Sequence, residues 1–185
     1  SADDWEREQE TLHVLQSNSL MQQIADFVIS FVQSKHLTPD VFVGVPEGAT
    51  TLGLITQLAW AKQSKQYKEG SHHFAMLRTT PKAHGHPMDK NVIGSLEGKV
   101  LLLEDVTTTG ASLIDCYKRL KDMNVDVLAS IGLTNRKDKD VAAELKALGC
   151  DYYDMSDARA IIQSLINSKQ LSTELQAKLS TEINH

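Results

Sequence analysis

The sequence has few cysteines and no long apolar run. Cys116 and Cys150, among 185 residues, are too few for the disulfide framework of a small secreted domain, and neither lies in a metal-ligand spacing. We therefore expect two inert thiols in a reducing cytoplasm. No apolar run approaches the roughly 20 residues of a membrane-spanning helix, so we expect no membrane segment. The start at Ser1 has no positively charged stretch followed by an apolar one, so we see no secretion signal.

Positive charge is also in short supply. The net charge is −5, whereas a nucleic-acid-binding protein usually carries a basic surface, so we expect no nucleic-acid partner. Seven histidines are present, but no helical H-x3-H pair brings two of them together, and we expect no structural metal site. The length and the hydrophobic content of 41% suit a single domain, residues 1–185, with one core.

Strand-like and helix-like segments alternate along the chain. Short apolar runs predict strands at 40–46, 72–78, 100–104, 125–134 and 150–154, and helical spacing predicts helices at 19–37, 50–63, 112–124 and 139–149. This alternation predicts an α/β protein with a central, mainly parallel five-stranded sheet flanked by helices. The apolar stripes of the first two helices predict inward-facing Leu20, Ile24, Phe27, Phe31 and Val32, and then Leu54, Ile55, Leu58 and Ala61.

Three segments stand outside this alternation. Residues 1–12 are expected to be a solvated lead-in, and 156–185 to form one or two C-terminal helices. Residues 79–95 lack periodicity and contain two prolines and two glycines. Because a structureless stretch of more than about 12–15 residues is uncommon inside a compact domain and is often a functional lid, we expect a mobile loop there.

Two acids and a row of hydroxyl side chains follow the most apolar strand. Ligands of parallel α/β sheets bind at the carboxyl ends of strands, where Glu104 and Asp105 are expected. The turn from Thr107 to Ser112 leads into a helix, whose free N–H groups and dipole suit a phosphate monoester. The acids would repel phosphate but can accept hydrogen bonds from a sugar diol, directly or through magnesium-bound water. Together these features describe a ribose 5-phosphate site, the alternative being an ordinary strand end with solvated acids.

The stretch "VLLLEDVTTTGAS" (100–112) closely resembles the phosphoribosyl pyrophosphate signature of type I phosphoribosyltransferases. The resemblance implies a type I phosphoribosyltransferase-like fold with C-terminal helices. It also implies that the acids hold the ribose hydroxyls and that the turn holds the 5-phosphate. The implied contacts with phosphoribosyl pyrophosphate come from Glu104, Asp105, Val106, Thr107, Thr108, Thr109, Gly110, Ala111 and Ser112.

Three more segments, 42–53, 77–100 and 132–136, resemble orotate phosphoribosyltransferases in particular, so that the likeness covers about residues 15 to 165. It implies a pyrophosphate turn at Pro46, Glu47 and Gly48. It also implies a mobile catalytic loop at 79–95 in which Lys82 and His84 act with Arg78 and Asp105, and an orotate site at Thr108 and Arg136. Taken alone, the loop charges and Arg136 also fit solvated surface residues, and Gly48 fits simple strand-to-helix punctuation.

The implied reaction joins orotate to ribose 5-phosphate and releases pyrophosphate, giving orotidine 5-monophosphate in pyrimidine (UMP) synthesis. Fixed cations would meet the charge that grows on the leaving pyrophosphate. Mg²⁺ would be held mainly through substrate and would keep several waters, with no firm protein ligand. The family also implies a cytoplasmic homodimer that shares the 79–95 loop across subunits. The alternatives are a type I enzyme for another base and a non-catalytic sensor of phosphoribosyl pyrophosphate.

The sequence departs from the orotate pattern at three places. Thr79 stands where the family usually has a lysine, which removes one cation from the pyrophosphate site. The family usually begins with a segment rich in Lys, Ser, Gly and aromatic residues that covers orotate, and nothing like it precedes Leu12. Asn135 replaces the usual aspartate, a smaller change.

Overall fold

The structure, a computed structural model, describes residues 18–136 and 140–167 of the chain. The predicted lead-in at 1–12 lies outside the described residues, as do residues 168–185 of the predicted C-terminal helices. The main sheet in the described part has four parallel strands in the order β1-β4-β5-β6. These strands are β1 (Val41–Gly44), β4 (Lys99–Thr107), β5 (Asp126–Asn135) and β6 (Tyr152–Asp157).

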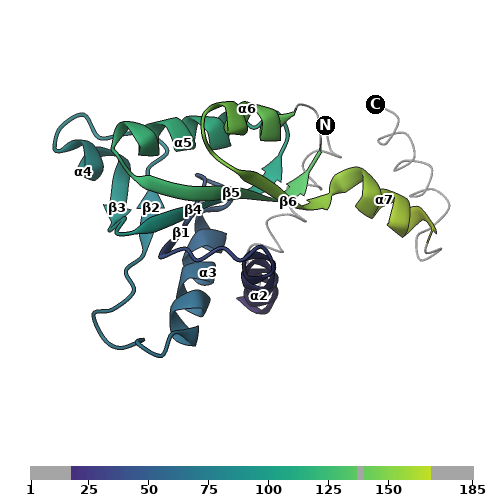
Figure 1. The fold of residues 1–185 in the computed structure, drawn as a ribbon, viewed down its shortest axis with the longest axis horizontal. Coiled ribbons are helices and arrows are strands. Elements are labelled where there is room, and N and C mark those ends of the chain that lie inside the picture. The colour runs from purple at the N-terminus through teal and green to yellow at the C-terminus, as the bar shows by residue number, and fades with distance from the viewer. Residues whose placement is uncertain (1–17, 137–139, 168–185) are drawn as a thin grey trace.

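Helices cover both faces of this sheet (Figure 1). On one face lie α2 (Asn18–Ser34) and α3 (Thr50–Gln63), and on the other lie α5 (Ala111–Asp122) and α6 (Val141–Ala147). Successive strand side chains alternate between two buried clusters: Val43 and Leu102 pack with α5 and α6, whereas Phe42 packs with α2 and α3. Because both faces are covered, β4 is a continuous apolar run, and the predicted α/β fold with a mainly parallel sheet is confirmed.

The prediction of five strands in this sheet was wrong. β2 (Ala75–Leu77) pairs instead with β3 (Val92–Gly94) in a separate antiparallel two-stranded sheet. The buried side chain of Gln57 bridges the gap between the β1 edge and the segment that leads into β2. It accepts a hydrogen bond from the Phe42 N–H (3.0 Å) and donates one to the His73 carbonyl (2.8 Å). A side-chain amide therefore supplies the hydrogen bonds that a fifth strand would have made with this edge.

The segment 79–95 contains regular structure that its composition did not predict, namely a short helix, α4 (Pro87–Asn91), followed by β3. Pro87 suits the first helical position because its missing N–H would have had no partner there. The His86 side chain accepts a hydrogen bond from the Met88 N–H at 3.4 Å. Residues 79–86 and Ser95 remain without helix or strand.

The inward faces of the first two helices were only partly predicted. Val32 and Ala61 are buried, but Leu20, Phe27 and Leu58 are exposed, Phe27 to 68%. The buried stripe of α2 is formed by Met21, Ala25, Val28, Ile29 and Val32. α2 carries apolar residues around much of its circumference, so the spacing of apolar residues does not decide which of two faces is buried. Packing against the sheet decides it.

The observed ends of helices and strands differ from the predicted ones by a few residues, which is normal for boundaries predicted from sequence. β6 starts two residues later than predicted and extends to Asp157, so that α7 (Ala158–Asn167) begins at Ala158 instead of Ser156. Both cysteines are free and buried, as expected, and burial raises the pKa of the Cys116 thiol to about 12. None of the described helices is long and apolar enough to cross a bilayer.

Two phenylalanines with opposite burial test this packing. Phe42 is fully buried, whereas Phe27 is 68% exposed. We expect Phe42→Ala to lower the free energy of unfolding by about 3–5 kcal/mol, because it leaves a cavity in the core. Phe27→Ala should change it by no more than about 0.5 kcal/mol. Urea unfolding followed by circular dichroism would measure both, and similar losses from the two variants would contradict the described burial.

Candidate active site

The acid pair lies at the carboxyl end of β4, beyond the last residue that pairs with β1. Glu104 is 8% exposed, while Asp105 is half-buried and its Oδ1 accepts a hydrogen bond of 2.8 Å from the Val106 N–H. The pKa of Glu104 is raised to about 8. Burial is the main cause, and the hydrogen bond to Asp105 and the negative charge of that residue also raise it. At neutral pH the raised pKa therefore favours the protonated form of Glu104 in the free protein.

The turn after β4 opens directly into α5. Gly110 adopts a left-handed conformation (φ 72°) at the N-cap of the helix and has no side chain to cap α5; the Thr109 hydroxyl accepts a long hydrogen bond of 3.4 Å from the Ala111 N–H. Thr109, Ala111 and Ser112 are exposed and Thr108 is half-buried. A helix start without a side-chain cap keeps N–H groups available for an anion, and the helix dipole favours negative charge there.

Thr107 lies beneath this turn and joins it to β6 and to the end of β5. Its carbonyl accepts a hydrogen bond of 2.9 Å from the Arg136 N–H, which follows β5. Its Oγ1 is 3.1 Å from the Tyr152 hydroxyl on β6, which donates to it. The Thr107 hydroxyl thus faces the sheet, and only its backbone can serve the turn.

Tyr152 is a site residue that the sequence did not reveal. It reaches Thr107 across β5 only because Gly132 lies between them: a Cβ at this glycine would be 2.4 Å from the Tyr152 oxygen and 2.5 Å from Thr107 Oγ1. Burial raises the pKa of Tyr152, so its hydroxyl keeps the proton that it donates. The signal in the sequence was Gly132 itself, a glycine inside a strand, which marks a close approach.

The predicted pyrophosphate turn, at Pro46, Glu47 and Gly48, lies beside the acid pair. Val45, just before it, donates its N–H to the Leu103 carbonyl at 2.8 Å, which extends the β1–β4 pairing to the turn. A Cβ at Gly48 would lie 2.4 Å from Asp105 Oδ2. Glycine at this position therefore does more than end the strand, because it allows the turn to approach the Asp105 carboxylate.

The residues at the start of the 79–95 segment reach the same turn. Thr79 donates a hydrogen bond from Oγ1 to Glu47 Oε1 at 3.2 Å. The threonine that replaces the usual lysine therefore pairs with the acid of the pyrophosphate turn. Arg78 is half-buried, and its Nε is buried without a hydrogen-bond partner in the described part of the chain.

The structure does not bring all predicted site residues together. Lys82 and His84 are exposed, and no hydrogen bond or ion pair among the described residues joins either side chain to the strand end. Arg136 is exposed too, but its backbone is tied to Thr107. The geometry therefore unites the acid pair, the turn, the pyrophosphate turn and Arg136, and leaves the loop cations apart.

The described residues alone do not complete a magnesium site. Within the described ranges, no group of three or more His, Cys, Asp and Glu residues could hold a metal. The carboxylate oxygens of Asp105 are of the hard type that Mg²⁺ prefers. A magnesium ion here would complete its shell with substrate oxygens and water.

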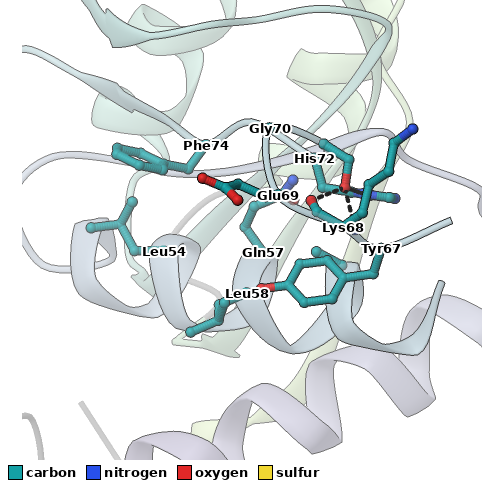
Figure 2. A pocket seen from close by; sticks show the side chains of 11 residues that line it. Leu54, Gln57, Leu58, Tyr67, Lys68, Glu69, Gly70, His72 and Phe74 are labelled. Carbon is teal, nitrogen blue, oxygen red and sulfur yellow. Dashed lines mark hydrogen bonds between the residues drawn. The ribbon is translucent and has the colours of Figure 1, made fainter.

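A separate cavity of about 640 Å³ lies beside α3 and the segment that follows it (Figure 2). Leu54, Leu58, Tyr67 and Phe74 lie around it. None of its lining residues belongs to the predicted site. We take the β4 strand end as the functional site, since polar groups and a perturbed carboxyl converge there, whereas the cavity is mainly apolar.

The raised pKa of Glu104 predicts a pH-dependent stability. Below pH 4.5 both the folded and the unfolded chain hold the proton. Between about pH 4.5 and 8 only the unfolded chain releases it, so the free energy of unfolding falls as pH rises. Glu104→Gln removes this loss. The stability of the variant relative to the original chain should therefore rise by up to about 1.4 kcal/mol per pH unit in this window. Urea unfolding at several pH values measures it, and a difference independent of pH would contradict the protonated carboxyl.

Comparison with known proteins identifies the family of the chain. No protein-family model matches the chain. The orotate phosphoribosyltransferase of Oceanobacillus iheyensis is 30% identical over 167 residues, a match that covers 86% of this chain and 74% of the relative.

Solved structures share the fold. The UMP synthase of Leishmania donovani superposes with a TM-score of 0.68 at 14% identity, covering 92% of this chain and 34% of that protein. The Mycobacterium tuberculosis orotate phosphoribosyltransferase, solved in complex with 5-phospho-α-D-ribosyl 1-diphosphate, superposes with a TM-score of 0.58 at 17% identity, covering 77% and 75% of the two chains. With the identity, coverage and fold all in agreement, the chain belongs to the orotate phosphoribosyltransferase family.

Proposed function

We propose that this protein transfers the 5-phosphoribosyl group from phosphoribosyl pyrophosphate to orotate, giving orotidine 5-monophosphate and pyrophosphate in the pyrimidine (UMP) pathway of the cytoplasm. The observation that carries the proposal is the end of β4, where the carboxyl pair Glu104 and Asp105 directly precedes the uncapped start of α5. A sugar that carries both a diol and a phosphate matches this arrangement, and the M. tuberculosis relative was solved with such a ligand.

In this proposal the 5-phosphate binds the backbone N–H groups between Thr108 and Ser112, where helix dipole and amides both favour an anion. The ribose hydroxyls donate to Glu104 and Asp105. Because the pKa of Glu104 is raised in the free protein, binding of the diol and of a cation would favour the ionised form of this carboxyl. Val106, which is 49% exposed, lies between the acids and the turn and contacts the sugar.

The pyrophosphate binds beside Asp105, on the turn in which Gly48 approaches that carboxylate. Arg78, half-buried and with an unpartnered Nε, supplies a fixed positive charge to it. Magnesium, when bound, would be held in part by Asp105 and would supply positive charge that neutralises the charge growing on the leaving pyrophosphate. Lys82 and His84 approach when the loop closes, exclude water and stabilise the departing pyrophosphate.

Orotate lies on the β5 side of the sugar. Arg136 is exposed at the end of β5 and its backbone is fixed by Thr107, so its planar guanidinium can pair with the orotate carboxylate by two hydrogen bonds. The half-buried Thr108 borders the same side.

The Glu47–Thr79 pair is the observation that favours a second candidate, a type I enzyme for another base or a sensor of phosphoribosyl pyrophosphate. It places an acid and a hydroxyl where the family usually has a cation. The retained cations Arg78, Lys82 and His84 favour the enzyme, because a sensor needs no stabilisation of a leaving group.

An absorbance assay distinguishes these candidates. With Mg²⁺ and phosphoribosyl pyrophosphate the protein should consume orotate, and adenine, xanthine and uracil should not substitute. Arg136→Ala should raise the KM for orotate about 10- to 100-fold, the loss expected for a charge-assisted pair, and leave the KM for phosphoribosyl pyrophosphate within about twofold. Turnover of another base, or saturable binding without turnover, would support the second candidate.

We further propose that the active form is a homodimer in which the loop serves the neighbouring subunit. Two observations support this. Lys82 and His84 make no contact with the strand end of their own chain in the described structure. Leu58, Phe74 and Ile93, on α3 and around the β2–β3 ribbon, expose 49%, 53% and 39% of their surface. An apolar surface of this kind, close to the base of the loop, suits a second copy.

Hybrid dimers test the shared loop. Lys82→Ala damages only the loop, and Asp105→Asn damages only the strand end, so each variant alone should be nearly inactive. Unfolding and refolding them together should restore about a quarter of the original activity, because half of the dimers are hybrids with one intact site. Lys82→Ala refolded with His84→Ala is the matched control and should restore nothing. Equal, near-zero activity in both mixtures would show that the loop serves its own chain.

A further inference from the structure

The loop that carries Lys82 and His84 has a defined stem. β2 and β3 pair antiparallel, and the pairing continues past them, because the Arg78 N–H donates to the Asn91 carbonyl at 2.7 Å. Further out, the Lys82 N–H donates to the Lys90 carbonyl at 2.9 Å. Residues 79–90 therefore form an arm that leaves the molecule from the Arg78–Asn91 pair.

One guanidinium holds both legs of this stem. Arg119 Nη2 donates to the Arg78 carbonyl at 2.8 Å and to Asn91 Oδ1 at 3.1 Å, and its Nε donates to the same Oδ1 at 3.3 Å. The Asn91 amide in turn donates to the Pro87 carbonyl at 2.9 Å, which ties α4 to the same point. A single side chain thus fixes the two ends of the arm and the short helix within it.

The surroundings of Arg119 distinguish this contact from that of an ordinary surface arginine. Its side chain is only 17% exposed, although it lies on the outer half of an amphipathic helix. Its ion pair with Asp115 is long, at 3.9 Å, and Asp115 is 68% exposed, so that pair adds little. The short contacts are all with the stem. A lysine would not reproduce them, because its ammonium lacks the planar fork that reaches two acceptors.

Arg119 also stands on the helix that begins at the phosphate turn. It lies eight residues after Ala111, the first residue of α5, which is about 12 Å along the helix axis. At that distance it does not touch the substrate, but α5 is a rigid rod between the turn and the stem. The phosphate turn and the stem of the arm are therefore held by the same helix.

We propose that Arg119 is a positioning residue that anchors the stem of the 79–90 arm to α5, and so fixes the point from which Lys82 and His84 swing. This rests on the proposed function. The anchor also holds the backbone of Arg78, whose side chain is the fixed cation of the pyrophosphate site. Loosening it should slow catalysis while the phosphate turn and the acid pair still bind phosphoribosyl pyrophosphate.

Amide hydrogen exchange on the unliganded full chain tests the anchor without any activity. Arg119→Ala should raise the exchange rates of the Arg78 and Lys82 amides by about tenfold, the effect of losing hydrogen bonds to a charged group. The amides of β4 should stay within about twofold. In Arg119→Lys the exchange rates of the Arg78 and Lys82 amides should lie between those of the original chain and those of Arg119→Ala. Asp115→Ala is the matched control: it removes the exposed ion pair, keeps the contacts with the stem and should leave both sets of amides unchanged.

Kinetics then separate positioning from general stability. Arg119→Ala should lower kcat about tenfold and leave the Kd for phosphoribosyl pyrophosphate within about twofold, and Arg119→Lys should recover part of kcat. Unchanged exchange at the stem, or equally faster exchange throughout β4, would overturn the proposal. So would equal losses of kcat and affinity. If the original protein turns over no base, the proposed function fails, and the exchange experiment still decides whether Arg119 anchors the arm.

Discussion

The close approach of Gly48 to the Asp105 carboxylate is the constraint on which the site depends. It places the turn after β1 against the carboxylate near the end of β4, so that the predicted pyrophosphate turn and the acid pair lie side by side. Any side chain at residue 48 would overlap the Asp105 carboxylate, which would have to move away from the turn. The parallel pairing of β1 with β4, extended by the Val45 N–H, aligns the strand ends that make this contact.

The sheet beneath this contact was readable from the sequence because its strands are buried on both faces. The run of Val100 to Leu103 has no polar alternation, which only a strand covered by helices on both sides can tolerate. The outer elements were less predictable. β3 has three residues, too few for a pattern, and the hydrogen bonds of Gln57 that take the place of a fifth strand depend on tertiary geometry. The prediction of the buried face of α2 failed for a similar reason. Phe27 and Val28 are both apolar, and only contact with the sheet decides that Val28 is the buried one.

The acid pair and the turn at 104–112 could be located from local sequence, because the chemistry and the strand-to-helix change occur within a dozen residues. Contacts between distant segments could not. Tyr152 reaches Thr107 from two strands away, Thr79 meets Glu47 across 32 positions, and Arg119 joins a helix to a loop stem. These contacts fix how the turn, the pyrophosphate side and the arm are placed relative to one another. The candidate site residues at 104–112 could thus be predicted from the sequence, whereas the contacts that position them are visible only in the structure.

The central claim is that the end of β4 binds a ribose phosphate, with its phosphate on the start of α5 and its diol on the acids. A crystal structure with phosphoribosyl pyrophosphate and magnesium tests it most directly. The account predicts that the 5-phosphate contacts the backbone N–H groups of residues 108–112 and that the ribose hydroxyls lie within hydrogen-bond distance of Glu104 and Asp105. A ligand bound elsewhere, for example in the cavity beside α3, with the strand end unchanged, would contradict it.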